Sequence, residues 1–147
     1  MWNINSNECL KYCISQTGSK CLILSKNNSL IICAGLDDVI RIWNIHTGYF
    51  LQSLLGHQGL ISFEMINDGQ HFASTDELGI IKIWSLDDFK CVSTLKNNSK
   101  KIDSLKSIDN NEIIACSIDG QIKLWTMRHD QCVNSFKTKE FICSRLF

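Results

Sequence analysis

The stretch LDDVIRIWNIHTG, residues 36–48, is the clearest sign of the fold because a related stretch recurs at a constant distance along the chain. The four tryptophans, Trp2, Trp43, Trp84 and Trp125, each lie 41 residues from the next. A constant period of about 20 to 50 residues indicates a repeat architecture in which each period forms one supersecondary unit.

The residues before each of the last three tryptophans alternate between apolar and basic side chains. Aliphatic residues stand three and one positions before the tryptophan, and arginine or lysine stands between them. This two-residue alternation predicts a β-strand with one buried face. We therefore expect each tryptophan strand to be an inner or middle strand of its sheet, with these side chains buried: Ile40, Ile42, Ile81, Ile83, Ile122 and Leu124.

Each period contains four short apolar or alternating runs separated by turns rich in Gly, Asn, Asp and Ser. In the middle period these runs are residues 60–66, 71–75, 80–84 and 90–97. Four short strands joined by such turns predict an all-β fold.

Composition limits the possible functions. The chain has 147 residues, of which 44% are hydrophobic, and its 15 basic and 15 acidic residues give a formal net charge of zero. A globally basic nucleic-acid binder is therefore not indicated. The start lacks the features of a signal peptide, and no apolar run is long enough to cross a bilayer. We expect an intracellular protein, cytoplasmic or nuclear, without membrane contact.

The eight cysteines include no CxxC pair. Cys9, Cys91 and Cys132 share one phase of the repeat, where the remaining period has Phe50. A cysteine that replaces phenylalanine is expected to act as a small buried hydrophobic residue. We expect no disulfides and no metal site, since thiols remain reduced inside cells and no Cys/His cluster has ligand spacing.

Two segments resemble the end of a WD40 repeat, DDVIRIWN at 37–44 and DGQIKLWT at 119–126, and Gly56–His57 resembles the glycine–histidine pair that opens such repeats. The resemblance covers essentially the whole chain. It implies a β-propeller with four-stranded antiparallel blades. We expect one domain over 1–147, with repeat units at about 3–43, 44–84 and 85–125 and a further repeat beginning in 126–147.

This division predicts a partial propeller with about three complete blades and incomplete strands at both ends. Propellers close with about four to eight blades, and closure protects their strand edges. We therefore expect a fragment of a longer propeller, or a chain that completes its ring with another polypeptide. The first alternative is favoured because both termini cut through a blade.

The family also builds a hydrogen-bonded tetrad from an aspartate, a histidine, a serine or threonine and the tryptophan. Carried onto this chain, the aspartate position holds Asp37, Leu78 or Asp119, the histidine position Gln16, His57 or Asn98, and the hydroxyl position Gly35, Asp76 or Ser117. No repeat has the complete set, although Asp76 can replace the missing aspartate beside His57. The expected tetrad-like residues are Asp37, His57, Asp76, Trp43, Trp84, Ser117, Asp119 and Trp125.

Catalysis is the alternative reading of His57, because a histidine near aspartate and serine suggests a hydrolytic triad. A structural tetrad explains it better, since no nucleophile elbow or paired general acid surrounds it. The adjacent carboxylates Asp37/Asp38, Asp76/Glu77 and Asp87/Asp88 fall in predicted turns, where aspartate is common for conformational reasons. We expect no catalytic residue, no cofactor and no small-molecule substrate.

The segment KNNSKK, residues 96–101, carries Lys96, Lys100 and Lys101 between two predicted blades. Loops at this position lie on one face of a propeller, where members of the family commonly bind partners. The segment is either a solvated basic loop or a site for phosphates or an acidic peptide.

The family resemblance implies a non-enzymatic scaffold for other proteins or peptides, by analogy of fold. An alternative is a component of an RNA-containing particle, because DGQIKLWTMRHDQCVNSF, residues 119–136, looks similar to repeats in tandem-propeller proteins of small-subunit ribosomal RNA processing. Binding that falls steeply with salt would favour the RNA-containing particle.

Overall fold

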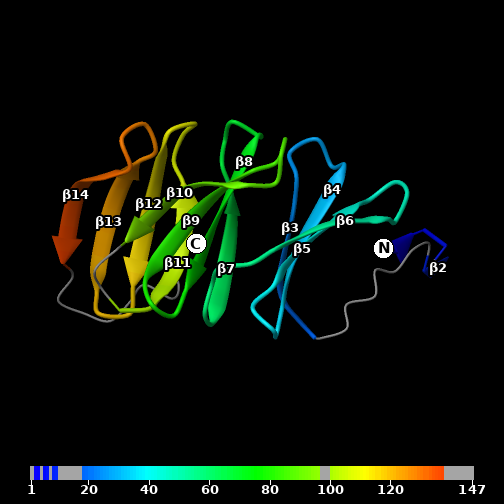
Figure 1. Cartoon of the computed structure of the whole chain (residues 1–147), viewed down its shortest axis with the longest axis horizontal. Coiled ribbons are helices and arrows are strands. Elements are labelled where there is room, and N and C mark those ends of the chain that lie inside the picture. The colour runs from blue at the N-terminus through cyan, green and yellow to red at the C-terminus, as the bar shows by residue number, and fades with distance from the viewer. Residues whose placement is uncertain (1, 4, 7, 10–17, 97–99, 138–147) are drawn as a thin grey trace.

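The chain forms an all-β structure, seen in a computed structural model that describes residues 2–3, 5–6, 8–9, 18–96 and 100–137. Three four-stranded antiparallel sheets stand side by side (Figure 1). The first contains β3 (Ser19–Leu24), β4 (Leu30–Gly35), β5 (Ile40–Asn44) and β6 (Phe50–Leu54); the second β7 (Leu60–Met65), β8 (His71–Asp76), β9 (Ile80–Ser85) and β10 (Cys91–Lys96); the third β11 (Ile102–Ser107), β12 (Glu112–Ser117), β13 (Gln121–Thr126) and β14 (Gln131–Lys137). Near the N-terminus β1 (Trp2–Asn3) pairs with β2 (Glu8–Cys9).

The prediction of an all-β chain with a tryptophan strand inside each sheet is confirmed. Within every sheet the strands pair in chain order, so β5, β9 and β13 each lie third of four. The first strands of neighbouring sheets meet, since β7 contacts both β3 and β11. This radial arrangement of antiparallel sheets is that of propeller blades.

Two apolar cores lie between the sheets, and the two-residue alternation of the strands builds both. In β9, Ile81 and Ile83 point toward the third sheet and join a core with Leu105 and Ile113. Trp84, on the opposite face of β9, packs in a core with Ile42 of the first sheet. The middle sheet therefore packs through both faces, with Ile81 and Ile83 on one face and Trp84 on the other.

The two outward faces of the stack expose side chains at positions that are buried in the middle sheet. Phe136 pairs with Ile122 as Leu95 pairs with Ile81, yet Phe136 is 54% exposed and Leu95 is 1% exposed. On the first sheet Leu22 is similarly exposed. Each outward face therefore has the apolar pattern of an inter-sheet face without a neighbouring sheet among the described residues.

The interpretation of three cysteines as buried hydrophobic residues is wrong. Cys9, Cys91 and Cys132 are exposed, and Phe50 at the same repeat position is largely exposed as well. In the three four-stranded sheets this phase lies at or next to the start of the fourth strand, which is the outer edge of the sheet, and Cys9 ends β2 of the two-stranded pair. At Cys91 a register shift interrupts the pairing of β10 with β9. An edge strand has one side open to water, so apolar substitution there does not require burial.

Thiol titration under denaturing, non-reducing conditions should find all eight cysteines free. None of the six cysteines within the described residues forms a disulfide, and burial raises the pKa of Cys21 to about 11, which keeps that thiol protonated and unreactive. A consistent deficit of two or more thiols would show that a disulfide forms.

Candidate functional site

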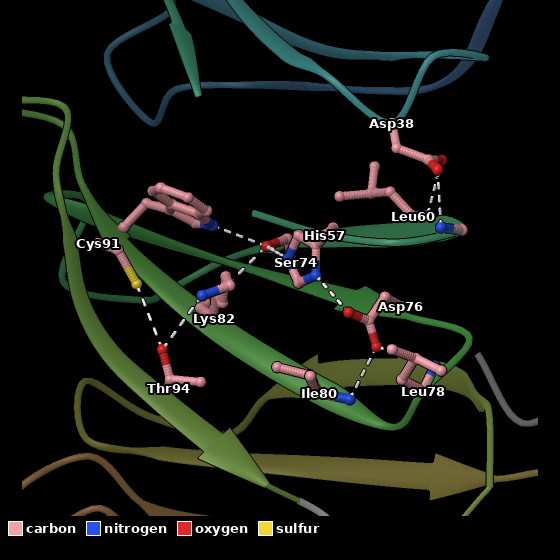
Figure 2. Close-up of polar contacts among 12 residues, drawn as sticks. Asp38, His57, Leu60, Ser74, Asp76, Leu78, Ile80, Lys82, Cys91 and Thr94 are labelled. Atoms are coloured by element: carbon pink, nitrogen blue, oxygen red, sulfur yellow. Dashed lines mark hydrogen bonds and ion pairs between the residues drawn. The ribbon is translucent and has the colours of Figure 1, made fainter. Parts of the chain in front are cut away.

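A buried hydrogen-bond network crosses the middle blade (Figure 2). The Nδ1 atom of His57 lies 2.8 Å from Oδ2 of Asp76, and its Nε2 atom lies 2.5 Å from the Ser74 hydroxyl. The indole Nε1 of Trp84 donates to the same hydroxyl at 2.7 Å. The other oxygen of Asp76, Oδ1, accepts the backbone N–H groups of Leu78 and Ile80 at 3.0 and 2.9 Å.

Local sequence explains why these groups meet. On β8 the side chains of Phe72, Ser74 and Asp76 alternate with Ala73 and Thr75, and Phe72 and Trp84 pack in the same core. Ser74 therefore shares a face with Trp84 of the neighbouring strand. Asp76 ends β8, so that its carboxylate closes the turn into β9.

If the His57 imidazole is neutral, only one arrangement of protons gives every hydrogen bond in the network a donor and an acceptor. The Trp84 N–H donates to Ser74 Oγ, the Ser74 O–H donates to His57 Nε2, and the His57 Nδ1–H donates to the Asp76 carboxylate. Each of these buried protons has an acceptor. The arrangement fixes the Nδ1–H tautomer of His57 and orients the β8–β9 turn.

Burial lowers the pKa of His57 below its usual value, against the opposing effect of the Asp76 carboxylate. In the window between the folded pKa and the ordinary value near 6.5, the unfolded chain binds more protons than the folded chain. The free energy of unfolding should therefore be fully retained above pH 6.5. It should fall as pH decreases below that value, by up to about 1.4 kcal/mol per pH unit.

Chemical unfolding followed by tryptophan fluorescence between pH 8 and pH 5 measures this slope. His57→Gln should flatten the slope, whereas His46→Gln, in an exposed turn, should leave it unchanged. An unfolding free energy that rises on acidification would mean that His57 is protonated in the folded chain.

The sequence expectation that no repeat has a complete tetrad is wrong for the middle blade, which has His57, Ser74, Asp76 and Trp84. The offsets were displaced by two residues: the hydroxyl lies ten residues before the tryptophan, and the carboxylate eight. Sequence reasoning missed Ser74 because it placed the hydroxyl position at Asp76, the residue that it expected to replace the missing aspartate beside His57. The alternation of Ser74 with the buried Phe72 on one strand face was the available signal.

In the other two blades the structure describes only part of the expected tetrads, because Gln16 and Asn98 at the histidine position lie outside the described residues. The hydroxyl position holds Cys33 and Ala115, and the indole Nε1 atoms of Trp43 and Trp125 are buried without a hydrogen-bond partner among the described residues. Trp43 instead packs edge-on against Phe50, with ring centroids 5.2 Å apart. These two tryptophans therefore stabilise their blades by packing.

The remaining expected residues support turns. Asp37 binds the Arg41 guanidinium at 2.5 Å. Asp119 accepts hydrogen bonds from the Ser117 hydroxyl and from the Gln121 N–H, and the Ser117 contact lowers its pKa. Ser117 thus does not act as the hydroxyl of a tetrad, because the Trp125 indole has no hydrogen-bond partner among the described residues. The predicted contacts of Asp37 and Asp119 with the histidine position fall on residues outside the described ones.

The neighbouring carboxylate Asp38 links the first blade to the second. Its two oxygens accept the backbone N–H groups of Gly59 and Leu60 at 2.8 and 3.0 Å, and Figure 2 shows Asp38 beside Leu60. Lys20 Nζ lies 3.1 Å from Oδ1 of Asp38. The hydrogen bond from Gly59 is the main reason that the pKa of Asp38 is lowered. Asp38 holds two blades together and does not form a paired acid with Asp37.

The network around His57 resembles a hydrolytic triad in composition but not in accessibility. The side chains of His57 and Asp76 are each 1% exposed, and Ser74 is fully buried. The Ser74 hydroxyl also already accepts the Trp84 N–H. A substrate carbonyl cannot approach this oxygen without opening the core, so the network's role is structural.

The basic residues between the second and third blades are accessible. Lys96 and Lys100 are exposed, and Lys101 is half-buried, while residues 97–99 of the same loop lie outside the described residues. Within the part of the chain that the structure describes, no group of three or more His, Cys, Asp or Glu side chains is placed to hold a metal ion. The same residues include no helix able to span a membrane.

Comparison with known families gives three consecutive matches. Residues 7–44, 48–85 and 89–126 match the family described as WD40, "WD domain, G-beta repeat". Each match ends one residue after a tryptophan of the 41-residue period.

Individual relatives and a solved structure agree with this result. The chain is 32% identical over 79 residues to "WD repeat-containing protein on Y chromosome" of Anopheles gambiae, and 29% identical over 75 residues to "Small ribosomal subunit protein RACK1" of Caenorhabditis elegans. These alignments cover 52% and 50% of this chain but only 7% and 23% of the relatives. The solved structure of U3-55K matches 84% of this chain and 40% of its own, with a TM-score of 0.78 at 21% identity.

Proposed function

Because the chain belongs to the WD40-repeat family, we propose that it is a non-enzymatic scaffold that binds other proteins or peptides. WD40 domains bind other proteins, and this chain has three consecutive repeats of that family. The observation that carries the proposal is the position of the polar groups. The His57 network is enclosed in the core, while the inter-strand turns at both rims of the blades stay accessible.

We further propose that each outward face of the three-blade stack packs against another blade, supplied by a longer polypeptide or by a second one. The exposure of Phe136 and Leu22 supports this, because equivalent positions are buried wherever two blades meet. A contiguous apolar face of this kind is more typical of an interface than of a free surface.

A second candidate function is participation in an RNA-containing complex. The likeness to a relative named as a small ribosomal subunit protein favours it, as does the basic group Lys96, Lys100 and Lys101. These lysines would contact phosphates without reading base sequence. In either role the protein acts inside the cell, in the cytoplasm or nucleus, and needs no small-molecule substrate or cofactor.

Affinity capture of the tagged chain from cells, with and without ribonuclease, separates the two functions. A scaffold retains its protein partners after ribonuclease treatment and at raised salt. A component of an RNA-containing complex loses most of them, and its binding falls steeply with salt. Recovery of no protein above the level of a Trp84→Ala control, which removes one side chain of the buried network, would contradict both.

A further inference from the structure

We propose that the groove between the second and third blades binds the arginine or lysine side chain of a partner peptide, with Asp130 as the charged anchor. The groove has a volume of about 250 Å³. Its apolar wall includes Ile83, Val92 and Met127, and its polar rim includes Asp68 and Asp130. The groove thus specifies which side chain of a partner the proposed scaffold would bind. This inference rests on the proposed scaffold function only in that a protein partner supplies the side chain.

The equivalent groove between the first and second blades is filled by the chain itself. Leu30, Leu86 and Phe89 pack against the core there. One period later these positions hold His71, Met127 and Asp130. Met127 packs against the second core, as Leu86 packs against the first.

Phe89 and Asp130 occupy equivalent positions of successive repeats, and their backbone conformations are similar. Both residues have positive φ angles, 56° at Phe89 and 52° at Asp130. The turn therefore projects its side chain in the same way in both blades. The aromatic side chain closes the first groove, and the carboxylate leaves the second one open.

The charges on the rim favour a cation. The Ser93 hydroxyl donates to Asp130 Oδ1 at 2.6 Å, and no hydrogen bond to Asp130 Oδ2 occurs among the described residues. Asp68 is paired with His71 at 2.6 Å. The described residues that line the groove include no lysine or arginine.

An arginine side chain satisfies both parts of the groove. Its aliphatic stem can cover Val92 and Met127, of which Val92 is 54% exposed in the free chain. Its planar guanidinium can then donate to the available oxygen of Asp130 in a charge-assisted hydrogen bond. A purely apolar side chain would leave the carboxylate at the mouth partly desolvated, which costs free energy.

Titration of the isotope-labelled full chain with Nα-acetyl-arginine amide, followed by NMR, tests the proposal. We expect saturable shifts at the backbone amides of Val92, Met127 and Asp130, with a dissociation constant on the order of millimolar for a single side chain. Nα-acetyl-citrulline amide has the same shape without the charge and should bind at least about fivefold more weakly.

Two variants localise the binding. Asp130→Asn should weaken arginine binding by a similar factor, and Asp130→Phe should abolish it by recreating the side chain that closes the first groove. Asp87→Asn, in the equivalent turn of the middle blade, removes the same charge elsewhere and should leave the affinity unchanged.

Three outcomes would overturn the proposal: no saturable shift at the groove, equal affinity for citrulline, or unchanged affinity in Asp130→Asn. Asp130→Asn is nearly isosteric at an exposed position, so its result does not depend on whether Asp130→Phe folds. Failure here leaves the capture of protein partners unaffected, and a failure of that capture leaves arginine binding measurable. The two proposals are therefore tested separately.

Discussion

Replacing Ile83 by alanine will lower the free energy of unfolding by about 2–5 kcal/mol, the range typical of large-to-small changes in a core. Ile83 is 2% exposed and packs in the core between the second and third blades. Its truncation leaves a cavity that the paired strands cannot easily close, because β9 is hydrogen-bonded on both sides. Denaturant unfolding of the wild type and the variant measures the difference.

Ile118→Ala is the matched control for Ile83→Ala. Ile118 is the same residue type in the β12–β13 turn and is 43% exposed, so its truncation should change the unfolding free energy by less than about 0.5 kcal/mol. A loss below about 0.5 kcal/mol for Ile83→Ala would mean that the inter-blade core is not formed as described.

Replacing Asp76 by alanine should destabilise the chain by about 3–5 kcal/mol, as loss of one partner of a buried pair does. The change removes the acceptor for His57 Nδ1 and for the N–H groups of Leu78 and Ile80. Each of these donors is then left near the core without its partner, which is costly. Asp76→Asn keeps one carbonyl acceptor and should lose less.

Asp87→Ala provides the comparison for Asp76, since Asp87 is exposed in the following turn and should change stability by less than about 0.5 kcal/mol. If Asp76→Ala were as mild as Asp87→Ala, the network around His57 would not contribute to folding. The structural interpretation of His57 would then fail as well.

The strand pattern could be predicted from sequence because it depends on local alternation. The aliphatic residues before each of the last three tryptophans and the polar turns around them predict the strands. They also predict the buried face in β5 and β9, whereas Ile122 and Leu124 of β13 are half-buried. Because the pattern recurs with the repeat period, the same reasoning predicts three blades. None of this requires knowledge of contacts between distant residues.

The partners within the buried network could not be predicted in the same way. The network depends on the register of β8 against β9, which brings Ser74 within reach of Trp84, and on the position of His57, three residues before β7. A shift of two residues preserves the face of a strand, so the alternation alone could not place the hydroxyl position at Ser74 rather than at Asp76. Only the register separates the two positions.

The exposed cysteines and the open groove show a second limit. A sequence repeat predicts that equivalent residues take equivalent positions in their blades. It does not predict whether their side chains are buried there or whether they fill the groove beside them. Cys91 lies on the outer strand, where one side meets water. Asp130 occupies the position of Phe89 on a similar backbone, yet it leaves open the groove that the phenylalanine closes.

Strand-resolved amide hydrogen exchange of the full chain tests whether three blades pack face to face through their inner strands. The structure predicts slow exchange in β8, β9 and β12, which are paired on both sides and buried, and fast exchange in β14, which is an edge strand with exposed side chains. Exchange in β9 as fast as in β14 would contradict the three-blade structure and the functional proposals that depend on it.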